Sequence, residues 1–343
     1  MARVMAVDLR AQQARWAITP DAEARLAAAT PPGWTVKMVS AATSADGDGG
    51  KPPSDESLAA VRDAEAYFGF GMARPLYDAA RSLKWVHTAA AGVGSLMFPA
   101  MRESGVIITN SAGIHAVPIA EQALAGILAL LRGLDVASTL QREGKWSREP
   151  FLSPESPMRE VGGLRALVIG AGGLGQALGT RLSALGVRCV GSRRRVERGV
   201  PSGFETIVGP EGWRALLPTS DILALCAPST SQTHGMIGAA ELAALPRHAI
   251  VVNVARGALL DEASLVAAIR SGHVRGAVLD VFAKEPLPAE SPLWELPNII
   301  LTPHVSGVTD RYWEREMDLF VHNWLAYDAG TVMRNVVDQL EGY

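Results

Sequence analysis

Three polar residues of this chain each follow an apolar stretch of the kind that forms a buried strand. Arg256 follows "VVNVA", Glu285 follows "VLDVFAK" and His304 follows "IILTP". Ligands of open α/β sheets bind at the carboxyl ends of the strands, where these side chains would lie. A guanidinium can grip a carboxylate and polarise a keto oxygen. An imidazole can protonate that oxygen as hydride arrives, and a carboxylate can hold the imidazole in one tautomer and favour its protonated form. The set predicts reduction of a 2-keto acid.

Each of the three residues also has a simpler interpretation. Arg256 could cap a helix, Glu285 could be a solvated loop acid, and His304 could be a hydrogen-bonded core histidine. Three such residues at successive strand ends, downstream of a nucleotide motif, favour the chemical interpretation.

The nucleotide motif is "GAGGLG", in which Gly170, Gly172 and Gly175 fit the spacing G-x-G-x-x-G. It follows the apolar run "ALVI" and opens a helical stretch, so backbone N–H groups at the helix start would face an anion. The absent side chains would let a pyrophosphate approach the backbone. The alternative is a tight strand–helix turn without a ligand.

The stretch "CVGSRRR" predicts which dinucleotide binds. Sites for NAD place an acid at the close of the second strand, where this chain has Ser192, Arg193 and Arg194. A neutral hydroxyl and one or two guanidinium groups suit a 2′-phosphate, so we expect NADPH to be preferred and NADH to be possible, with Arg195 pointing outward. The alternative is a solvated basic loop.

The sequence predicts that the strands and helices that position these residues form two successive α/β series. In the first, strands are expected at 3–7, 34–39, 66–70, 84–90 and 106–109, with a loop from Ser40 to Ser54 and a helix that Ser54 caps. A long helix from Val117 to Leu134 follows, with Pro118 in its first turn, and then an irregular segment at 147–163. The second series predicts six strands, at 165–170, 187–191, 221–228, 249–255, 276–282 and 298–303, before a helix from Thr309 to Tyr327. The pattern predicts α/β architecture, with a doubly wound parallel sheet in the second series.

Size and composition narrow the class of protein. The chain has 343 residues, 48% of them hydrophobic, which is enough for two domains. A net charge of −3 argues against nucleic-acid or membrane-surface partners. Cys189 and Cys226 lie in apolar runs and are expected to be buried free thiols, and no Cys or His spacing suggests a metal site. No signal-peptide core or membrane-spanning stretch is apparent, so a cytoplasmic location is expected.

Over essentially its whole length the chain resembles the D-isomer-specific 2-hydroxyacid dehydrogenases. The resemblance rests on "GAGGLG", "NVARGALLDEASLVAAI", "GAVLDVFAKEPLP" and "SPLWELPNIILTPHVSG". It implies that Arg256 binds substrate, that Glu285 and His304 are the acid–base pair, and that Asp280 meets the nicotinamide carboxamide. The stretches "NSAGIHAVPIAEQ" and "HVSGVTDRYWERE" are similar to the glyoxylate/hydroxypyruvate reductase-like members.

The family's organisation implies a Rossmann-type cofactor domain (111–304) inserted into a discontinuous flavodoxin-like substrate domain (1–110 and 305–343). The loop "TAAAGVG" looks like the one whose backbone amides take the substrate carboxylate, here at Ala91 and Gly92. The family usually has an aspartate where this chain has Gly94, which puts the local loop geometry in question. His87 and His115 are weaker candidates for substrate contact. Packing explains Tyr312 and Trp313 at least as well as a role at the site does.

The expected activity is therefore reduction of small 2-keto acids. The alternative is a nucleotide-dependent, corepressor-like binding protein on the same fold. The extensive apolar face of the helix 117–134 and the family's habit predict a symmetric homodimer built on this helix and the segment beyond it. Trp146 resembles an aromatic that some relatives insert into the partner's active site, although a Trp buried within its own subunit is an equal alternative.

Overall fold

The computed structural model describes residues 3–43, 52–154 and 156–339, and these residues form two compact units. Unit 1 comprises Met1–His115 and Val308–Tyr343, and unit 2 comprises Ala116–Gly307. The chain therefore passes between units after His115 and after Gly307, where the sequence suggested divisions after residues 110 and 304. Most of the expected loop from Ser40 to Ser54 lies outside the described residues.

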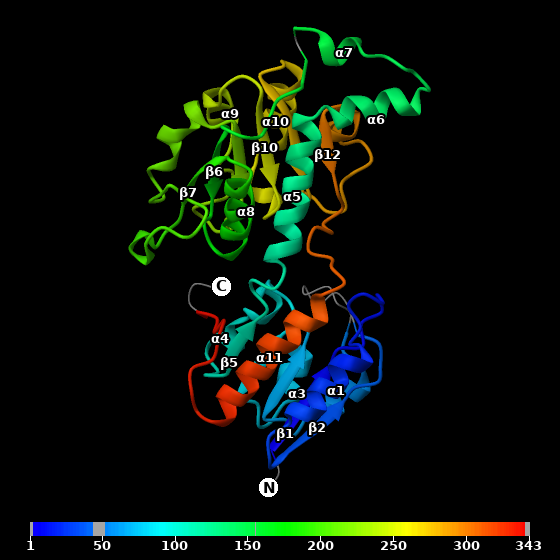
Figure 1. Cartoon of the computed structure of the whole chain (residues 1–343). Coiled ribbons are helices and arrows are strands. Elements are labelled where there is room, and N and C mark those ends of the chain that lie inside the picture. Colours follow the sequence, from blue (N-terminus) through cyan, green and yellow to red (C-terminus); the bar gives the residue numbers. More distant parts are fainter. Residues whose placement is uncertain (1–2, 44–51, 155, 340–343) are drawn as a thin grey trace. The chain divides into compact units, whose positions relative to one another are not determined.

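Unit 1 is built on a five-stranded parallel sheet in the order β2-β1-β3-β4-β5 (Figure 1). Its helices cover both faces, because α1 and α11 contribute to the apolar core on one face and α2, α3 and α4 to the core on the other. Ser54 caps α2 as expected, since its hydroxyl accepts the Ser57 N–H at 3.0 Å. The strands are β1 Arg3–Asp8, β2 Trp34–Met38, β3 Ala66–Gly69, β4 Trp85–Thr88 and β5 Ile107–Asn110, and the helices are α1 Pro20–Ala29, α2 Asp55–Val61, α3 Arg74–Ala79, α4 Pro99–Arg102 and α11 Tyr312–Asp328.

Unit 2 is built on a seven-stranded parallel sheet in the order β12-β11-β10-β9-β6-β7-β8. Helices α5 and α8 pack against one face, and α9 and α10 against the other. The strands are β6 Arg165–Ile169, β7 Arg188–Ser192, β8 Thr206–Val208, β9 Ile222–Leu225, β10 Ala249–Asn253, β11 Val274–Leu279 and β12 Ile299–Leu301, and the helices are α5 Ala116–Leu131, α6 Leu134–Arg142, α7 Glu149–Leu152, α8 Gly173–Ala184, α9 Ala239–Ala244 and α10 Glu262–Arg270. Two parallel α/β sheets confirm the predicted fold class.

Three element predictions were wrong. The second series has seven strands rather than six, because the short edge strand β8 lacks an apolar run long enough to stand out. The helix expected from Val117 to Leu134 ends at Leu131, since Gly133 adopts a left-handed φ of 64° and α6 begins after it. The last helix begins at Tyr312, three residues later than expected.

The junction of α5 and α6 is held by an ion pair. Arg275 Nη2 lies 2.8 Å from Asp135 in the first turn of α6 and also donates to the Leu130 carbonyl near the end of α5. No single helix within the described ranges is long and apolar enough to cross a membrane, and α5 and α6 meet that criterion only as a pair bent by 73°. Both cysteines are free, with Cys189 buried and Cys226 only partly buried, and burial raises the pKa of Cys189 to about 11 and that of Cys226 to about 12.

Candidate active site

The glycine motif forms the turn between β6 and α8 in unit 2. Gly170 has a left-handed φ of 97°, and a Cβ there would overlap the backbone of Cys226 and Ala227. A Cβ on Gly175 would overlap the Gly170 carbonyl, so this glycine lets α8 pack closely on the turn. Gly172 differs, because a Cβ there would meet no atom within 4 Å among the described residues. The two outer glycines are thus needed by the fold, and the middle one leaves open space before the helix.

The close of β7 lies beside this turn. The Ser192 carbonyl accepts the backbone N–H groups of Gly170 and Ala171 at 2.9 Å, which fixes the strand end against the motif. The Ser192 side chain is buried, with 4% of the residue exposed. The Arg193 guanidinium is half-buried and donates to the Gly199 carbonyl, whereas Arg194 is exposed. The three residues therefore present one buried hydroxyl, one guanidinium fixed within its loop and one guanidinium at the surface.

His304 and Glu285 are in contact at the carboxyl edge of the same sheet. Nδ1 of His304 lies 2.7 Å from Oε2 of Glu285, and Glu285 Oε1 accepts the Phe282 N–H at 2.9 Å. Both carboxylate oxygens are therefore used, which fixes the carboxylate against the ring. A carboxylate at Nδ1 selects the tautomer or charge state with a proton there and orients the ring.

The backbone at His304 has an uncommon conformation. Its φ of 54° is left-handed, a region that non-glycine residues rarely occupy. Its N–H group donates to the Asp280 carbonyl at 2.8 Å and to the Thr302 carbonyl at 3.0 Å. Strained residues of this kind persist where the surrounding structure over-determines them, and they cluster at functional sites.

Asp280 lies at the end of β11 and is 1% exposed. Oδ1 accepts the Thr302 hydroxyl at 2.6 Å and the Val305 N–H at 3.0 Å, and Oδ2 accepts both the N–H and the hydroxyl of Ser306. These bonds fill the four acceptor positions of a carboxylate. Asp280 therefore holds the loop on both sides of His304, and its contact with the nicotinamide carboxamide stays a prediction from the resemblance.

Arg256 follows β10, and its side chain is exposed. Its Nη1 donates to the Ala255 carbonyl at 2.6 Å. Its loop packs against the loop that leads to Glu285, since a Cβ on the next residue, Gly257, would overlap the backbone of Phe282. The structure gives no direct contact between the Arg256 side chain and the Glu285–His304 pair.

A positioning residue of this loop went unnoticed in the sequence. Asn253 is buried at the end of β10, donates to the Arg256 carbonyl at 2.9 Å and accepts the Ala255 N–H at 3.2 Å. The signal that could have identified it is an amide side chain at the end of the apolar run "AIVVN", just before "ARG".

Ala91 and Gly92 lie in unit 1, in the exposed loop after β4. The Asn110 side chain donates to the Ala91 carbonyl at 2.8 Å, which holds the loop against the end of β5. Gly94 begins a short 3₁₀ helix, its φ is not left-handed, and a Cβ there would meet nothing within 4 Å. The described backbone would therefore accept an aspartate at this position without strain.

The histidines and aromatic residues that were the weaker candidates in the sequence are held by contacts within unit 1. His87 is fully buried, with Nδ1 2.7 Å from the Thr109 hydroxyl and Nε2 3.0 Å from Glu316. His115 stacks on Tyr312 with ring centroids 5.5 Å apart. Tyr312 and Trp313, the first two residues of α11, are buried in the apolar core of unit 1, as the packing interpretation predicted.

Trp146 lies in unit 2 and is 95% exposed, so the alternative of a Trp buried within its own subunit was wrong.

Taken together, unit 2 has the architecture of a dinucleotide-binding α/β domain, with a histidine–glutamate pair at the carboxyl edge of its sheet. A family model described as the NAD-binding domain of D-isomer-specific 2-hydroxyacid dehydrogenases matches residues 124–306. The chain is 31% identical to the glyoxylate reductase of Korarchaeum cryptofilum over 272 residues, which are 77% of this chain and 79% of that protein. The chain belongs to the D-isomer-specific 2-hydroxyacid dehydrogenase family.

Solved structures agree with this assignment. A family member from Xanthobacter autotrophicus in complex with NADPH and MES is 29% identical and superposes with a TM-score of 0.79, covering 100% of both chains. An NADPH-dependent glyoxylate/hydroxypyruvate reductase from Sinorhizobium meliloti in complex with NADP and sulfate is 26% identical, with a TM-score of 0.75 over 99% of this chain and 100% of that one. The matches to D-3-phosphoglycerate dehydrogenases, at 34% and 31% identity, span 48% of those longer proteins.

Proposed function

We propose that this protein is an NAD(P)-dependent D-2-hydroxyacid dehydrogenase that acts mainly as a reductase of small 2-keto acids of the glyoxylate and hydroxypyruvate kind. The observation that carries the proposal is the 2.7 Å contact between His304 Nδ1 and Glu285 Oε2, at the carboxyl edge of the sheet that bears the glycine motif. The K. cryptofilum and S. meliloti relatives, named for glyoxylate and hydroxypyruvate, support the substrate class.

The residues of unit 2 fit a dinucleotide. Open space at Gly172 leaves room for a pyrophosphate against the start of α8, where backbone N–H groups and the helix dipole favour an anion. Gly170, Gly172 and Gly175 would hold that part of the cofactor, with Ser192, Arg193 and Arg194 at its adenosine end. When bound, the nicotinamide supplies the hydride.

The chain's own residues supply binding and the proton. Arg256 pairs with the substrate carboxylate. Glu285 holds His304 at Nδ1, which leaves Nε2 to donate a proton to the keto oxygen as hydride reaches the carbonyl carbon. The products are a 2-hydroxy acid, the oxidised cofactor and a neutral imidazole. The reverse reaction is oxidation of the hydroxy acid by the oxidised cofactor, with His304 as the base.

We infer that NADPH is preferred over NADH. No acid stands at the close of β7, where an NAD site needs one to accept the ribose hydroxyls, and three arginines follow Ser192 there, of which Arg193 and Arg194 are assigned to the phosphate. NADPH or NADP in the two solved relatives supports this inference.

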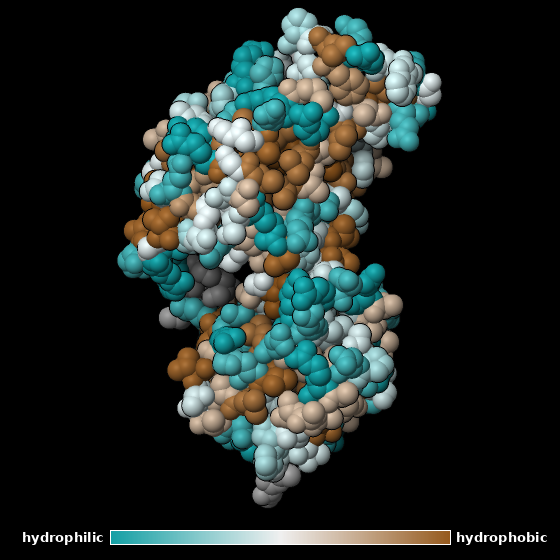
Figure 2. All heavy atoms as spheres, viewed as in Figure 1, coloured by the Kyte–Doolittle hydropathy of each residue, from teal (hydrophilic) through white to brown (hydrophobic). Residues whose placement is uncertain are grey.

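The proposal also includes a homodimer. The described parts of the segment 134–158 present large apolar side chains to solvent: Leu134 is 56% exposed, Trp146 95% and Leu152 70%. Figure 2 shows apolar surface around α7. None of the residues of α6 is buried in its own subunit, and such exposed apolar surface marks an interaction site.

Steady-state reduction of glyoxylate and hydroxypyruvate, followed at the nicotinamide absorbance, tests the activity. Turnover that saturates with either acid and is faster with NADPH supports the proposal. Tight cofactor binding without turnover on any small 2-keto acid would instead favour a corepressor-like binding protein.

A further inference from the structure

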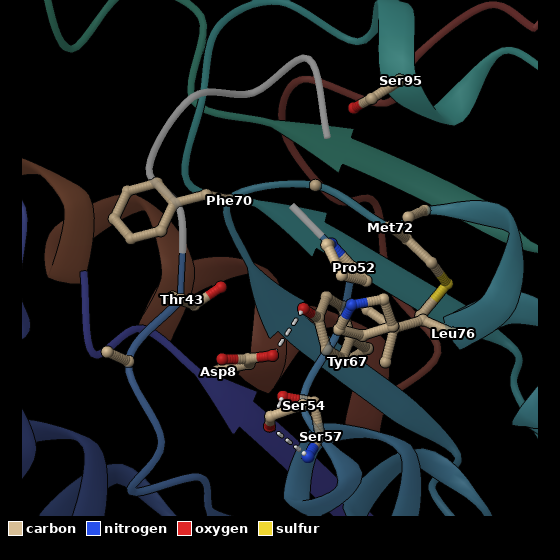
Figure 3. A pocket seen from close by; sticks show the side chains of 14 residues that line it. Asp8, Thr43, Pro52, Ser54, Ser57, Tyr67, Phe70, Met72, Leu76 and Ser95 are labelled. Atoms are coloured by element: carbon tan, nitrogen blue, oxygen red, sulfur yellow. Dashed lines mark hydrogen bonds between the residues drawn. The ribbon is translucent and has the colours of Figure 1, made fainter. Parts of the chain in front are cut away.

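Unit 1 contains a cavity at the switch point of its sheet. The chain runs from β1 outward to β2 and then returns to β3 on the other side of β1, so the crevice between the carboxyl ends of β1 and β3 is where open α/β sheets bind ligands. A cavity of about 130 Å³ lies at this place, lined by Asp8 at the end of β1, by Phe70 and Met72 after β3, and by residues that flank α2 (Figure 3).

Two polar atoms that line the cavity are buried without a hydrogen-bond partner in the part of the chain that the structure describes. These are Oδ1 of Asp8, a residue that is 2% exposed, and the hydroxyl of Ser95. The other Asp8 oxygen accepts the Tyr67 hydroxyl at 3.4 Å. An unpaired buried carboxylate oxygen is costly unless a ligand or ordered water satisfies it.

Burial raises the pKa of the Asp8 carboxyl, and the nearby charge of Glu56 adds to the rise. The neighbouring hydroxyls of Ser57, Tyr67 and Thr43 lower this pKa and only partly offset the rise. The negative charge of Asp8 therefore lacks full compensation within the described residues. A cation bound next to it would supply that compensation.

The strand β3 is shaped to bring a hydroxyl to this carboxylate. Tyr67 and Gly69 point to the same face of the strand, and a Cβ on Gly69 would overlap the Tyr67 phenol ring. The Tyr67 ring therefore points toward the carboxyl end of β3 and occupies the space that a side chain at position 69 would fill. It places its hydroxyl against Asp8 (Figure 3).

The lining selects by charge and by size. Among the described residues that line the cavity there is no lysine, arginine or histidine, so a carboxylate or phosphate would meet no positive side chain there and would be repelled by Asp8. Phe70 and Met72 add apolar surface, which suits a short carbon chain better than a bare metal ion that needs six or more oxygens. Since an apolar cavity of about 150 Å³ holds benzene, this one would take a ligand of about five or six heavy atoms.

We propose that this cavity binds a small organic ammonium group, with its N–H donors on the Asp8 carboxylate and its carbon chain against Met72. The proposal does not depend on the proposed dehydrogenase activity. The ammonium can belong to a free amine or to the end of a longer molecule, and both present the same chemistry to Asp8.

Isothermal titration of the full chain with three probes of equal length tests the proposal. Butylammonium should bind saturably at one site, about tenfold or more tighter than 1-butanol, because it alone forms a charge-assisted bond. Butyrate should not bind. Equal binding of butanol, or no saturable binding of butylammonium, would overturn the proposal and leave Asp8 satisfied by water.

A pair of variants locates the site. Asp8→Asn should weaken butylammonium binding about tenfold or more, whereas Asp63→Asn, at an exposed position of the same unit, should leave it unchanged. Unchanged binding to Asp8→Asn would overturn the assignment. If that variant fails to fold, the three-probe comparison on the unaltered chain still decides. Hexylammonium distinguishes the sources, since its retention points to a longer molecule and its loss to a small free amine.

Discussion

The His304 ring is held by one carboxylate at Nδ1, and this fixed orientation is what the proposed proton transfer needs. We predict that His304→Ala lowers turnover by about 10²-fold or more, because no other group would protonate the keto oxygen. Glu285→Gln should cost less, since an amide oxygen can still accept the Nδ1 proton. Initial rates of reduction and of oxidation, with saturating cofactor, measure both losses.

Cofactor affinity is the control for these two variants. Fluorescence titration should give NADPH dissociation constants close to that of the unaltered enzyme, because neither side chain touches the glycine turn in the structure. Near-normal turnover of His304→Ala would contradict the assignment.

The two guanidinium groups after β7 carry the predicted cofactor preference. Removing Arg193 or Arg194 should lower kcat/KM for NADPH by about tenfold or more, since each charge-assisted bond contributes roughly 1.5–3 kcal/mol. The values for NADH should barely change, and added salt should reduce the difference because the site is partly exposed. The matched control is Arg195→Ala, an exposed arginine of the same loop. Faster turnover of the unaltered enzyme with NADH than with NADPH would refute this prediction.

At the residue scale, the sequence predicted partners that lie close along the chain or at neighbouring strand ends. The Glu285–His304 contact is of this kind. The sequence could not predict that His87 pairs with Glu316, because the partners are 229 positions apart and meet only when α11 packs on the first sheet. The contacts of Asp280 were missed for another reason, since its carboxylate accepts two backbone N–H groups and two hydroxyls from a loop whose conformation no pattern reveals.

At the scale of elements, the middle glycine of the turn can be separated from its neighbours. We predict that Gly172→Ala folds with an unchanged melting temperature, because the backbone there has an ordinary φ of −90° and the Cβ would point into open space. NADPH should nevertheless bind about tenfold or more weakly, since the methyl group would occupy the approach of the pyrophosphate. Thermal melting and cofactor titration measure the two effects.

Gly175→Ala is the matched control for that variant. Its Cβ would overlap the Gly170 carbonyl, so the cost should appear as a loss of stability of about 1–3 kcal/mol from overpacking. If Gly172→Ala bound NADPH normally, the pyrophosphate would have to lie elsewhere.

The elements with long apolar runs could be predicted from the sequence, and those with short runs could not. Strands such as β6 and β10 are fully or almost fully buried and stood out in the sequence. The three-residue edge strand β8 has no fully buried residue and was missed. The break after Leu131 was missed because Gly133 lies inside a continuous helical pattern. In the structure Gly133 is left-handed, and the Arg275–Asp135 contact from a distant strand holds the turn.

At the scale of the whole molecule, the insertion of unit 2 into unit 1 was expected only from the resemblance. Nothing in composition or spacing indicated that the segment after Gly307 returns to the first sheet. Its return is held by contacts that form only in the folded state, such as the Tyr312 hydroxyl donating to the Ala89 carbonyl at 2.6 Å. Long-range topology of this kind depends on complementary surfaces rather than on local patterns.

The exposed apolar side chains of the segment 134–158 lead to the last prediction, a homodimer. We expect Trp146→Ser combined with Leu152→Ser to shift the protein from dimer to monomer, because burial of such side chains contributes roughly 1.5–3 kcal/mol each. The melting temperature of the unaltered protein should rise with concentration, as for any folded state stabilised by association. Trp294→Ser is the matched control, since Trp294 is also a solvent-exposed tryptophan of unit 2, at 56%, outside this segment. Sedimentation velocity measures the outcome, and an active monomer of the unaltered protein at working concentration would contradict it.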